Sequence, residues 1–173
     1  MYSKIYYVDK RVTVSNSASD FADSLDLNDH ILKTAGQSSF VNVTTSTKDL
    51  KPADSGKTII LNVATGSALT LPSASEGLVY RVITATDLSS GSYTITAKGA
   101  DLLTGGILSV DDVTPEAAAM FKPDVSDDLI ITFNGTTTGG EIGTDITITA
   151  ISSDRWYVSG TVAANGTLAT PFS

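Results

Sequence analysis

Alternation of apolar and polar residues with a period of two constrains this chain more than any other feature. It is clearest in Asp145–Ile151, where Ile146, Ile148 and Ala150 alternate with Asp145, Thr147 and Thr149. A β-strand turns successive side chains to opposite faces, whereas a helix repeats every 3.6 residues. Two further segments show the same period, Tyr93–Ala97 and Leu78–Ile83. These segments therefore predict strands with one buried face.

In Leu78–Ile83 the second row of side chains, Val79, Arg81 and Ile83, is also mostly apolar. A strand that is apolar on both faces is typical of the middle of a covered sheet. We therefore expect this strand to be buried on both faces.

Short runs rich in threonine and apolar residues predict more strands, because β-branched side chains suit a pleated, half-buried surface. Glycine-containing turn signals separate these runs. The additional predicted strands are 57–63, 68–71, 106–110, 129–134 and 155–160. Many short strands with such turns are typical of sandwiches and barrels. The sequence predicts an all-β fold, either an antiparallel β-sandwich or a jelly-roll-like barrel, with an N-terminal arm.

The connection between two of these strands has its own signals. Pro72 lacks a backbone N–H, so it closes its strand or lies at a sheet edge. Gly77 then supplies the conformational freedom with which the chain enters the next strand. An ordinary link between strands explains this stretch.

The first fifty residues lack the regular strand pattern of the rest of the chain. We therefore divide the chain into an N-terminal arm, 1–50, and a β-sandwich domain, 51–173. Residues 2–8 are compatible with a strand, and residues 20–33 have loosely helical apolar spacing. Polar Ser, Asn and Asp residues surround both segments. We expect an arm that docks on a neighbouring molecule; the alternative is a strand and short helix folded onto the same domain.

The segment Thr114–Phe121 is a candidate helix. Thr114 can cap it, Pro115 is favoured at the first helical position, and Glu116 complements the helix dipole. The alternative is an edge strand that carries Ala-Met-Phe into the core.

Charge and composition argue against several classes of partner. The 173 residues carry a formal net charge of −8, with 11 basic residues scattered among 19 acidic ones. Binding to nucleic acid phosphates or to an anionic membrane needs clustered basic residues, so we expect neither partner. No segment has the apolar length of a membrane span or a signal-peptide core, which predicts synthesis in the cytoplasm. Without cysteine, disulfides and thiolate metal sites do not arise.

The sequence offers little catalytic equipment. His30 is the only histidine, and it lies in a polar stretch without signs of a pocket. No Gly-x-Ser-x-Gly elbow or nucleotide-binding glycine loop occurs. The carboxylates that could form a catalytic pair are Asp111, Asp112, Asp124, Asp127, Asp128 and Glu141. They resemble solvated loop charges, and 124–128 lacks the spacing of a calcium loop. We predict a protein that is not an enzyme, with no cofactor and no bound metal.

Three groups of segments occur in a particular order along the chain: Asp54–Ile60 with Gly66–Pro72; Glu76–Val82 with Tyr93–Ala97 and Gly99–Asp101; and Asp145–Ile148 with Ser153–Val158. This order resembles that of capsid decoration (cement) proteins of tailed bacteriophages. It is also similar to modules of phage head fibres and tail fibres. The resemblance covers residues 54–160.

The resemblance implies a homotrimer on the outer surface of an icosahedral phage head, assembled in the bacterial host's cytoplasm. Such a protein would bind the major capsid protein between capsomers and stabilise the expanded shell. The alternative that it implies is a trimeric fibre module that binds host-surface glycans, with Trp156 or Tyr157 as a stacking platform. A glycan-cleaving appendage with paired carboxylates is a third reading.

For the decoration role we predict contacts to capsid or neighbouring subunits through the apolar N-terminal stretch. These contact residues are Tyr2, Ile5, Tyr6, Tyr7 and Val8. A lone Trp on a late strand is more often a core anchor than a platform. We accordingly assign Leu71, Pro72, Leu78, Tyr80, Tyr93 and Trp156 to the core or architecture.

Overall fold

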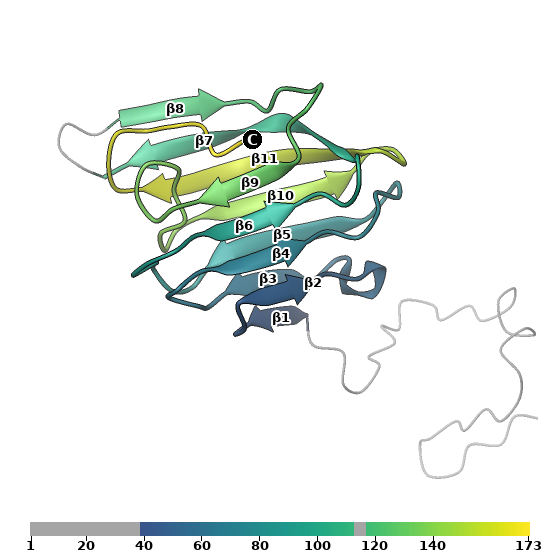
Figure 1. The fold of residues 1–173 in the computed structure, drawn as a ribbon, viewed down its shortest axis with the longest axis horizontal. Helices are drawn as coiled ribbons and strands as arrows, with labels where there is room; N and C mark the ends of the chain where they lie inside the picture. The colour runs from purple at the N-terminus through teal and green to yellow at the C-terminus, as the bar shows by residue number, and fades with distance from the viewer. Residues whose placement is uncertain (1–38, 113–116) are drawn as a thin grey trace, which may run out of the picture. The chain divides into compact units, whose positions relative to one another are not determined.

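The computed structural model describes residues 39–112 and 117–173. These residues form eleven strands and one 3-10 turn (Figure 1). The elements are β1 Phe40–Val43, β2 Thr47–Asp49, η1 Pro52–Asp54, β3 Thr58–Leu61, β4 Ser67–Thr70, β5 Val79–Thr84, β6 Tyr93–Thr96, β7 Leu102–Asp111, β8 Ala117–Phe121, β9 Ile130–Phe133, β10 Asp145–Ala150 and β11 Arg155–Ala164.

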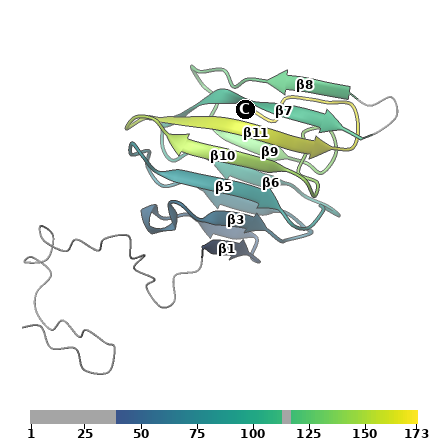
Figure 2. The same ribbon diagram turned by 180° about the vertical axis from the view of Figure 1, so that it is seen from behind.

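The strands form two sheets. The seven-stranded sheet has the order β1-β3-β5-β10-β11-β7-β8, and the four-stranded sheet has the order β2-β4-β6-β9. Figure 2, seen from behind, shows the larger sheet in front of the smaller one. The predicted all-β class is therefore confirmed.

Both sheets are mixed, so the prediction of a purely antiparallel fold is wrong. From β1 to β6 the chain alternates between the sheets, and each pair of neighbours within a sheet is then parallel. Parallel neighbours need a crossover connection, and here a strand of the other sheet provides it. The period-two pattern reports the face of a residue and carries no information on strand direction.

Buried side chains from both sheets form one hydrophobic cluster. Trp156 and Tyr80 are its largest members, and their ring centroids lie 5.9 Å apart. Leu71, Tyr80, Tyr93 and Trp156 are almost fully buried, Pro72 is buried, and Leu78 packs against the cluster. The predicted assignment of these residues to the core or architecture is confirmed.

Strand β5 differs from the prediction on one face. Tyr80 and Val82 are fully buried, as expected, but Arg81 is exposed and Val79 and Ile83 are only partly buried. The expectation of burial on both faces is wrong, because no second layer covers the outer side of this strand among the described residues.

The candidate helix over 114–121 is also wrong for its last five residues. Ala117–Phe121 forms strand β8, antiparallel to β7 and at the edge of the sheet. Phe121 packs against the core cluster. Pairing with β7 and partial burial of Phe121 outweigh the helix propensity of the alanines, because intrinsic propensities are small compared with tertiary contacts. Thr114, Pro115 and Glu116 lie outside the described residues.

The sheets begin on the N-terminal side of the predicted boundary at residue 50. Strand β1 pairs with β3, and β2 pairs with β4, so residues 40–49 contribute a strand to each sheet. The remainder of the predicted arm, including 2–8 and 20–33, lies outside the described residues.

The connection from β4 to β5 follows the predicted logic. Strand β4 ends just before Leu71 and Pro72, and Gly77 has a φ of +91°. Only glycine adopts that backbone conformation without strain.

Candidate interaction surfaces

The contact residues predicted from the sequence cannot be placed in the fold. Tyr2, Ile5, Tyr6, Tyr7 and Val8 all lie outside the described residues, as does His30. The candidate surfaces below are instead formed by the two sheets and by one corner between them.

The side of the seven-stranded sheet that faces away from the core is the first surface, and we call it the outer face. One row of side chains crosses all seven strands of it: Asn42, Ile60, Ile83, Asp145, Thr161, Leu108 and Met120. A neighbouring row contains Phe40, Thr58, Arg81, Thr147, Ser159 and Gly106. The outer face is therefore mainly apolar or hydroxylated.

The outer face carries little charge for a protein with a net charge of −8. Arg81 donates two hydrogen bonds to the Asp145 carboxylate, at 2.9 Å and 2.5 Å. These bonds lower the pKa of Asp145 and raise that of Arg81. Arg155, the other charged residue of the strands on this face, donates to the Val125 carbonyl. The acidic charge of the chain therefore lies elsewhere.

Exposed apolar side chains of β7 and β8 lie together on the outer face, and Phe40 of β1 is exposed at the opposite edge of the sheet. Leu108 and Val110 of β7 and Met120 of β8 are 37%, 39% and 65% exposed, and Leu108 is the register partner of Met120. Tyr157 of β11 is exposed on the same face. Contiguous exposed apolar groups on a sheet are typical of interaction surfaces.

The corresponding face of the four-stranded sheet is dominated by threonine. Its two rows are Thr47, Ala68, Thr94 and Thr132, and Asp49, Thr70, Thr96 and Ile130. This face carries one charged side chain and few large apolar ones, so it offers less buried area to a protein partner than the outer face.

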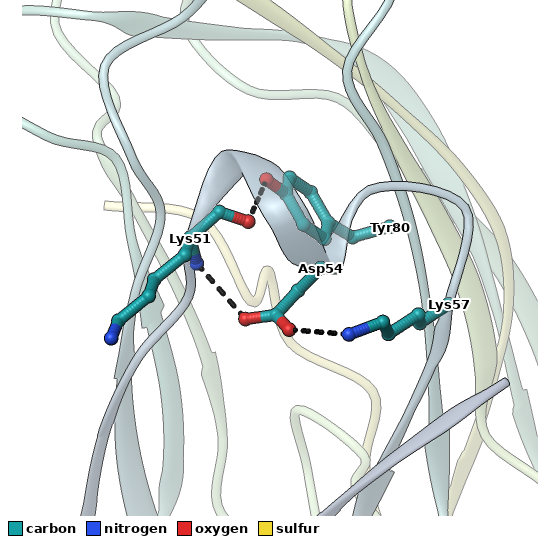
Figure 3. Close-up of polar contacts among 4 residues, drawn as sticks. All are labelled: Lys51, Asp54, Lys57 and Tyr80. Carbon is teal, nitrogen blue, oxygen red and sulfur yellow. Dashed lines mark hydrogen bonds and ion pairs between the residues drawn. The ribbon is translucent and has the colours of Figure 1, made fainter. Parts of the chain in front are cut away.

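Several basic residues lie around the 3-10 turn η1, which we call the corner at η1. The Tyr80 hydroxyl donates to the Lys51 carbonyl at 2.9 Å, which ties the turn to the core (Figure 3). The Asp54 carboxylate accepts from the Lys51 backbone N–H at 3.1 Å and from Lys57 Nζ at 2.9 Å. Partial burial opposes ionisation of Asp54, but these bonds and the nearby lysine charges lower its pKa. Burial, with a smaller contribution from Asp54, raises the pKa of Tyr80 to about 12.

An open groove of about 280 Å³ lies beside this corner. Its lining residues are Asp49, Leu50, Lys51, Pro52, Thr70, Leu71, Pro72 and Lys98. The Lys51 side chain points away from Asp54 (Figure 3). Asp49 offsets part of the charge of the two lysines, so the groove does not form a concentrated anion site.

The carboxylates that we named as candidates from the sequence fall into two groups. One lies around Glu141 and includes Asp111 and Asp112, and the other lies in the loop 124–128. Burial, and then the negative charges of Asp112, Asp87 and Asp111, raise the pKa of Glu141, against a hydrogen bond from Asn165 that lowers it. Sequence periodicity does not indicate this grouping, because its members come from separate loops and strand ends. The carboxylates of the second group, 124–128, lie in a loop that is held by hydrogen bonds between its own residues.

In that loop the Ser126 hydroxyl and backbone N–H donate to Asp124, and the Asp124 N–H donates to Asp128. The Ser126 hydrogen bonds lower the pKa of Asp124. These carboxylates are engaged in the turn itself. Within residues 39–112 and 117–173, no three His, Cys, Asp or Glu side chains are grouped so as to hold a metal ion.

Trp156 is fully buried and therefore cannot be a stacking platform for a glycan. Tyr157, on the opposite face of β11, is 45% exposed and remains available for that role. The alternation along β11 explains the difference, because adjacent side chains point to opposite faces.

Comparison with known proteins leaves the family open: no family model, curated protein or solved structure matches the chain. In the part of the chain that the structure describes, no helix is long and apolar enough to cross a membrane.

Proposed function

We propose that the protein is a bacteriophage virion protein that decorates the outer surface of an icosahedral head as a homotrimer. In this role it binds the major capsid protein between capsomers and stabilises the expanded shell. The order of sequence motifs over residues 54–160 supports the family, and the weakly charged outer face supports the binding role. We also propose that the two sheets are the layers of a β-sandwich, because their buried side chains share one core.

The outer face is the observation that carries the proposal. It spans seven strands, its charged side chains are few, and three of its exposed apolar groups, Leu108, Val110 and Met120, lie together on β7 and β8. Interfaces exclude charged side chains from their centres and need about 1,600 Å² of buried surface in total. In a trimer, binding of one subunit raises the effective concentration of the other two, so modest contacts suffice for occupancy.

The experiment is binding of the full chain to expanded, undecorated phage shells, followed by sedimentation of the shells and quantification of bound protein. The test variant is Thr161→Lys, which places a charge at an exposed position in the middle of the outer face. The matched control is Thr47→Lys, the same change at an exposed position on the four-stranded sheet. Both alter a strand threonine, so their effects on folding should be similar.

We expect Thr161→Lys to reduce occupancy and Thr47→Lys to leave it unchanged. Bound wild-type protein should also raise the melting temperature of the shells, because a ligand that binds the intact shell stabilises it. Absence of wild-type binding to expanded shells would refute the proposed function. Equal occupancy of both variants and wild type would refute the outer face as the binding surface.

Tyr157 favours a second candidate function, a trimeric head- or tail-fibre module that binds host-surface glycans. An exposed aromatic ring on a sheet face can stack on a sugar ring, and the next two positions on the same face of β11 supply the hydroxyl groups of Ser159 and Thr161. Calorimetric titration with purified host polysaccharide tests it. Heat of binding that is lost in Tyr157→Ala would support this function, and no heat with the wild-type protein would refute it for that glycan.

A further inference from the structure

Strand β8 leaves one edge of the seven-stranded sheet open. It is the last strand in the sheet order and pairs with β7 alone among the described residues. An unpaired edge presents free backbone N–H and C=O groups to another strand, and proteins commonly protect such edges with lysine, proline or covering segments. The five residues of β8, Ala117–Phe121, contain neither charge nor proline.

By contrast, the β9 edge of the smaller sheet is covered by another segment of the chain. Residues 171–173 cover strand β9: Thr132 N–H donates to Pro171, Ile130 N–H donates to Ser173, and Ser173 N–H donates back to Ile130. Phe172, at 6% exposure, completes a bridge to Ile131. In the described ranges, 39–112 and 117–173, the fold therefore closes the β9 edge and leaves the β8 edge available.

The sequence of β8 is complementary in size to itself when two copies run antiparallel. Pairing about a two-fold axis at Ala119 sets Ala118 opposite Met120 and Ala117 opposite Phe121 of the second copy. Each large side chain then meets a small one, which is the arrangement that packs without voids or clashes. A parallel pair would instead set like residues together and would place the two Lys122 side chains near each other.

We propose that two copies of this chain associate through β8, by antiparallel pairing centred on Ala119. The two seven-stranded sheets then continue into one another across a two-fold axis. Because that axis is perpendicular to the sheet, both outer faces stay on the same side. The exposed apolar groups Leu108, Val110 and Met120 of the two copies thus become neighbours.

This pairing is independent of the proposed virion function. In a free protein it forms a dimer, and between homotrimers it joins subunits of adjacent trimers. A five-residue pair of strands is a small contact compared with a standard interface, so the association depends on protein concentration. Failure on shells and failure of β8 pairing are measured in separate experiments.

The first test uses the absence of cysteine from the chain. The full chain with Ala119→Cys is oxidised mildly and run on a denaturing gel. Directly opposed residues of an antiparallel pair have Cα atoms about 4.5–5.5 Å apart, which lies within disulfide range. The control is Ile142→Cys, at a loop position that is 58% exposed and belongs neither to β8 nor to its partner strand β7.

We expect a covalent dimer from Ala119→Cys, formed faster at higher protein concentration, and little from Ile142→Cys. Equal rates of crosslinking for both variants would overturn the proposal. The denaturing gel counts covalently joined chains, so the result does not depend on whether the protein is also a trimer.

The second test checks the register by exchange of charges. In the proposed pair, residue 118 of each copy faces residue 120 of the other. The double variant Ala118→Lys with Met120→Lys therefore creates two like-charge pairs, whereas Ala118→Lys with Met120→Glu creates two opposite-charge pairs. Both double variants replace the same two exposed side chains, so each controls for the folding of the other.

Sedimentation equilibrium of the two double variants and the wild type measures the association. We expect the dissociation constant of the β8 contact to be at least about tenfold higher for the Lys/Lys variant than for the Lys/Glu variant, from two cross-strand pairs. The difference should shrink in high salt. Equal association of the two double variants, or a wild-type mass that does not change with concentration, would overturn the proposal.

Discussion

Replacement of Tyr80 by phenylalanine tests how the core is tied to the corner at η1. The ring of Tyr80 is fully buried against Trp156, and its hydroxyl donates to the Lys51 carbonyl at 2.9 Å. Tyr80→Phe keeps the ring and removes the hydrogen bond. A single intramolecular hydrogen bond contributes about 1 kcal/mol net to the free energy of unfolding. We expect the variant to be less stable than wild type by about that amount at pH 7.

The pH dependence gives the prediction its sharpest form. The pKa of Tyr80 is about 12 in the folded protein, and that of an unfolded tyrosine is about 10. The pKa of Tyr80 is higher in the folded state than in the unfolded state. The contribution of protonated Tyr80 to the free energy of unfolding is therefore complete below pH 10 and is lost as the pH rises from 10 to 12. A shift of that size corresponds to a loss of about 3 kcal/mol for wild type, which Tyr80→Phe does not suffer. The variant should therefore become the more stable protein near pH 12.

The assay is urea unfolding at several pH values, followed by the fluorescence of Trp156, the single tryptophan. Tyr93→Phe is the comparison, because the Tyr93 hydroxyl donates to Thr86 and accepts from Val63. Loss of two bonds should cost about 2 kcal/mol at pH 7. A difference between wild type and Tyr80→Phe that stays constant from pH 7 to pH 12 would refute the reasoning.

Three further predictions concern glycine conformation, core packing and a surface ion pair. Gly105→Ala should destabilise the fold by more than about 2 kcal/mol, because a Cβ there would lie 2.1 Å from a backbone carbonyl oxygen; Gly56→Ala, also at positive φ but with open space around it, should cost about 1 kcal/mol in thermal unfolding. Phe172→Ala should cost about 3 kcal/mol in urea unfolding, since the ring is buried over the β9 edge; a cost below about 1 kcal/mol would show that this edge is not held by the ring. The exposed pair Arg81–Asp145 should show little coupling in a double-mutant cycle of urea unfolding, and a strong coupling would contradict its exposure.

Strand positions and buried faces were predictable from local pattern. The alternation in 145–150 identifies Ile146 and Ile148 as core residues, and both are fully buried. Tyr93, Ile95 and Ala97 follow the same rule. These predictions succeed because the face of a strand residue depends only on its parity along the chain, once one side of the sheet is covered.

The mistakes concern relations between distant segments. Nothing in 117–121 alone distinguishes one helical turn from an edge strand, since both bury Phe121 and tolerate alanine. Pairing with β7 decided the outcome. Strand direction could not be predicted from local sequence either. Strands β1 to β6 become parallel neighbours only because the chain crosses between the two sheets.

On the surfaces, too, some features follow from local sequence pattern and others depend on distant segments. The sequence indicated that Trp156 was more suited to a core than to a ligand site, and it is buried. It contained no signal that Leu108 and Met120 would be neighbours, or that Glu141 would lie near Asp111 and Asp112. Such groupings depend on strand order and on loop placement, which no local pattern encodes.

By itself, then, the sequence determined an all-β chain, the approximate strands, the buried parity of most of them and the acidic charge. Those properties arise from interactions between residues close along the chain and from the partition of apolar side chains away from water. The tertiary structure alone decided the mixed strand directions, the weakly charged outer face, the closed β9 edge and the open β8 edge. Each of these depends on which distant strands share hydrogen bonds, and that choice minimises the free energy of the whole fold rather than of any one segment.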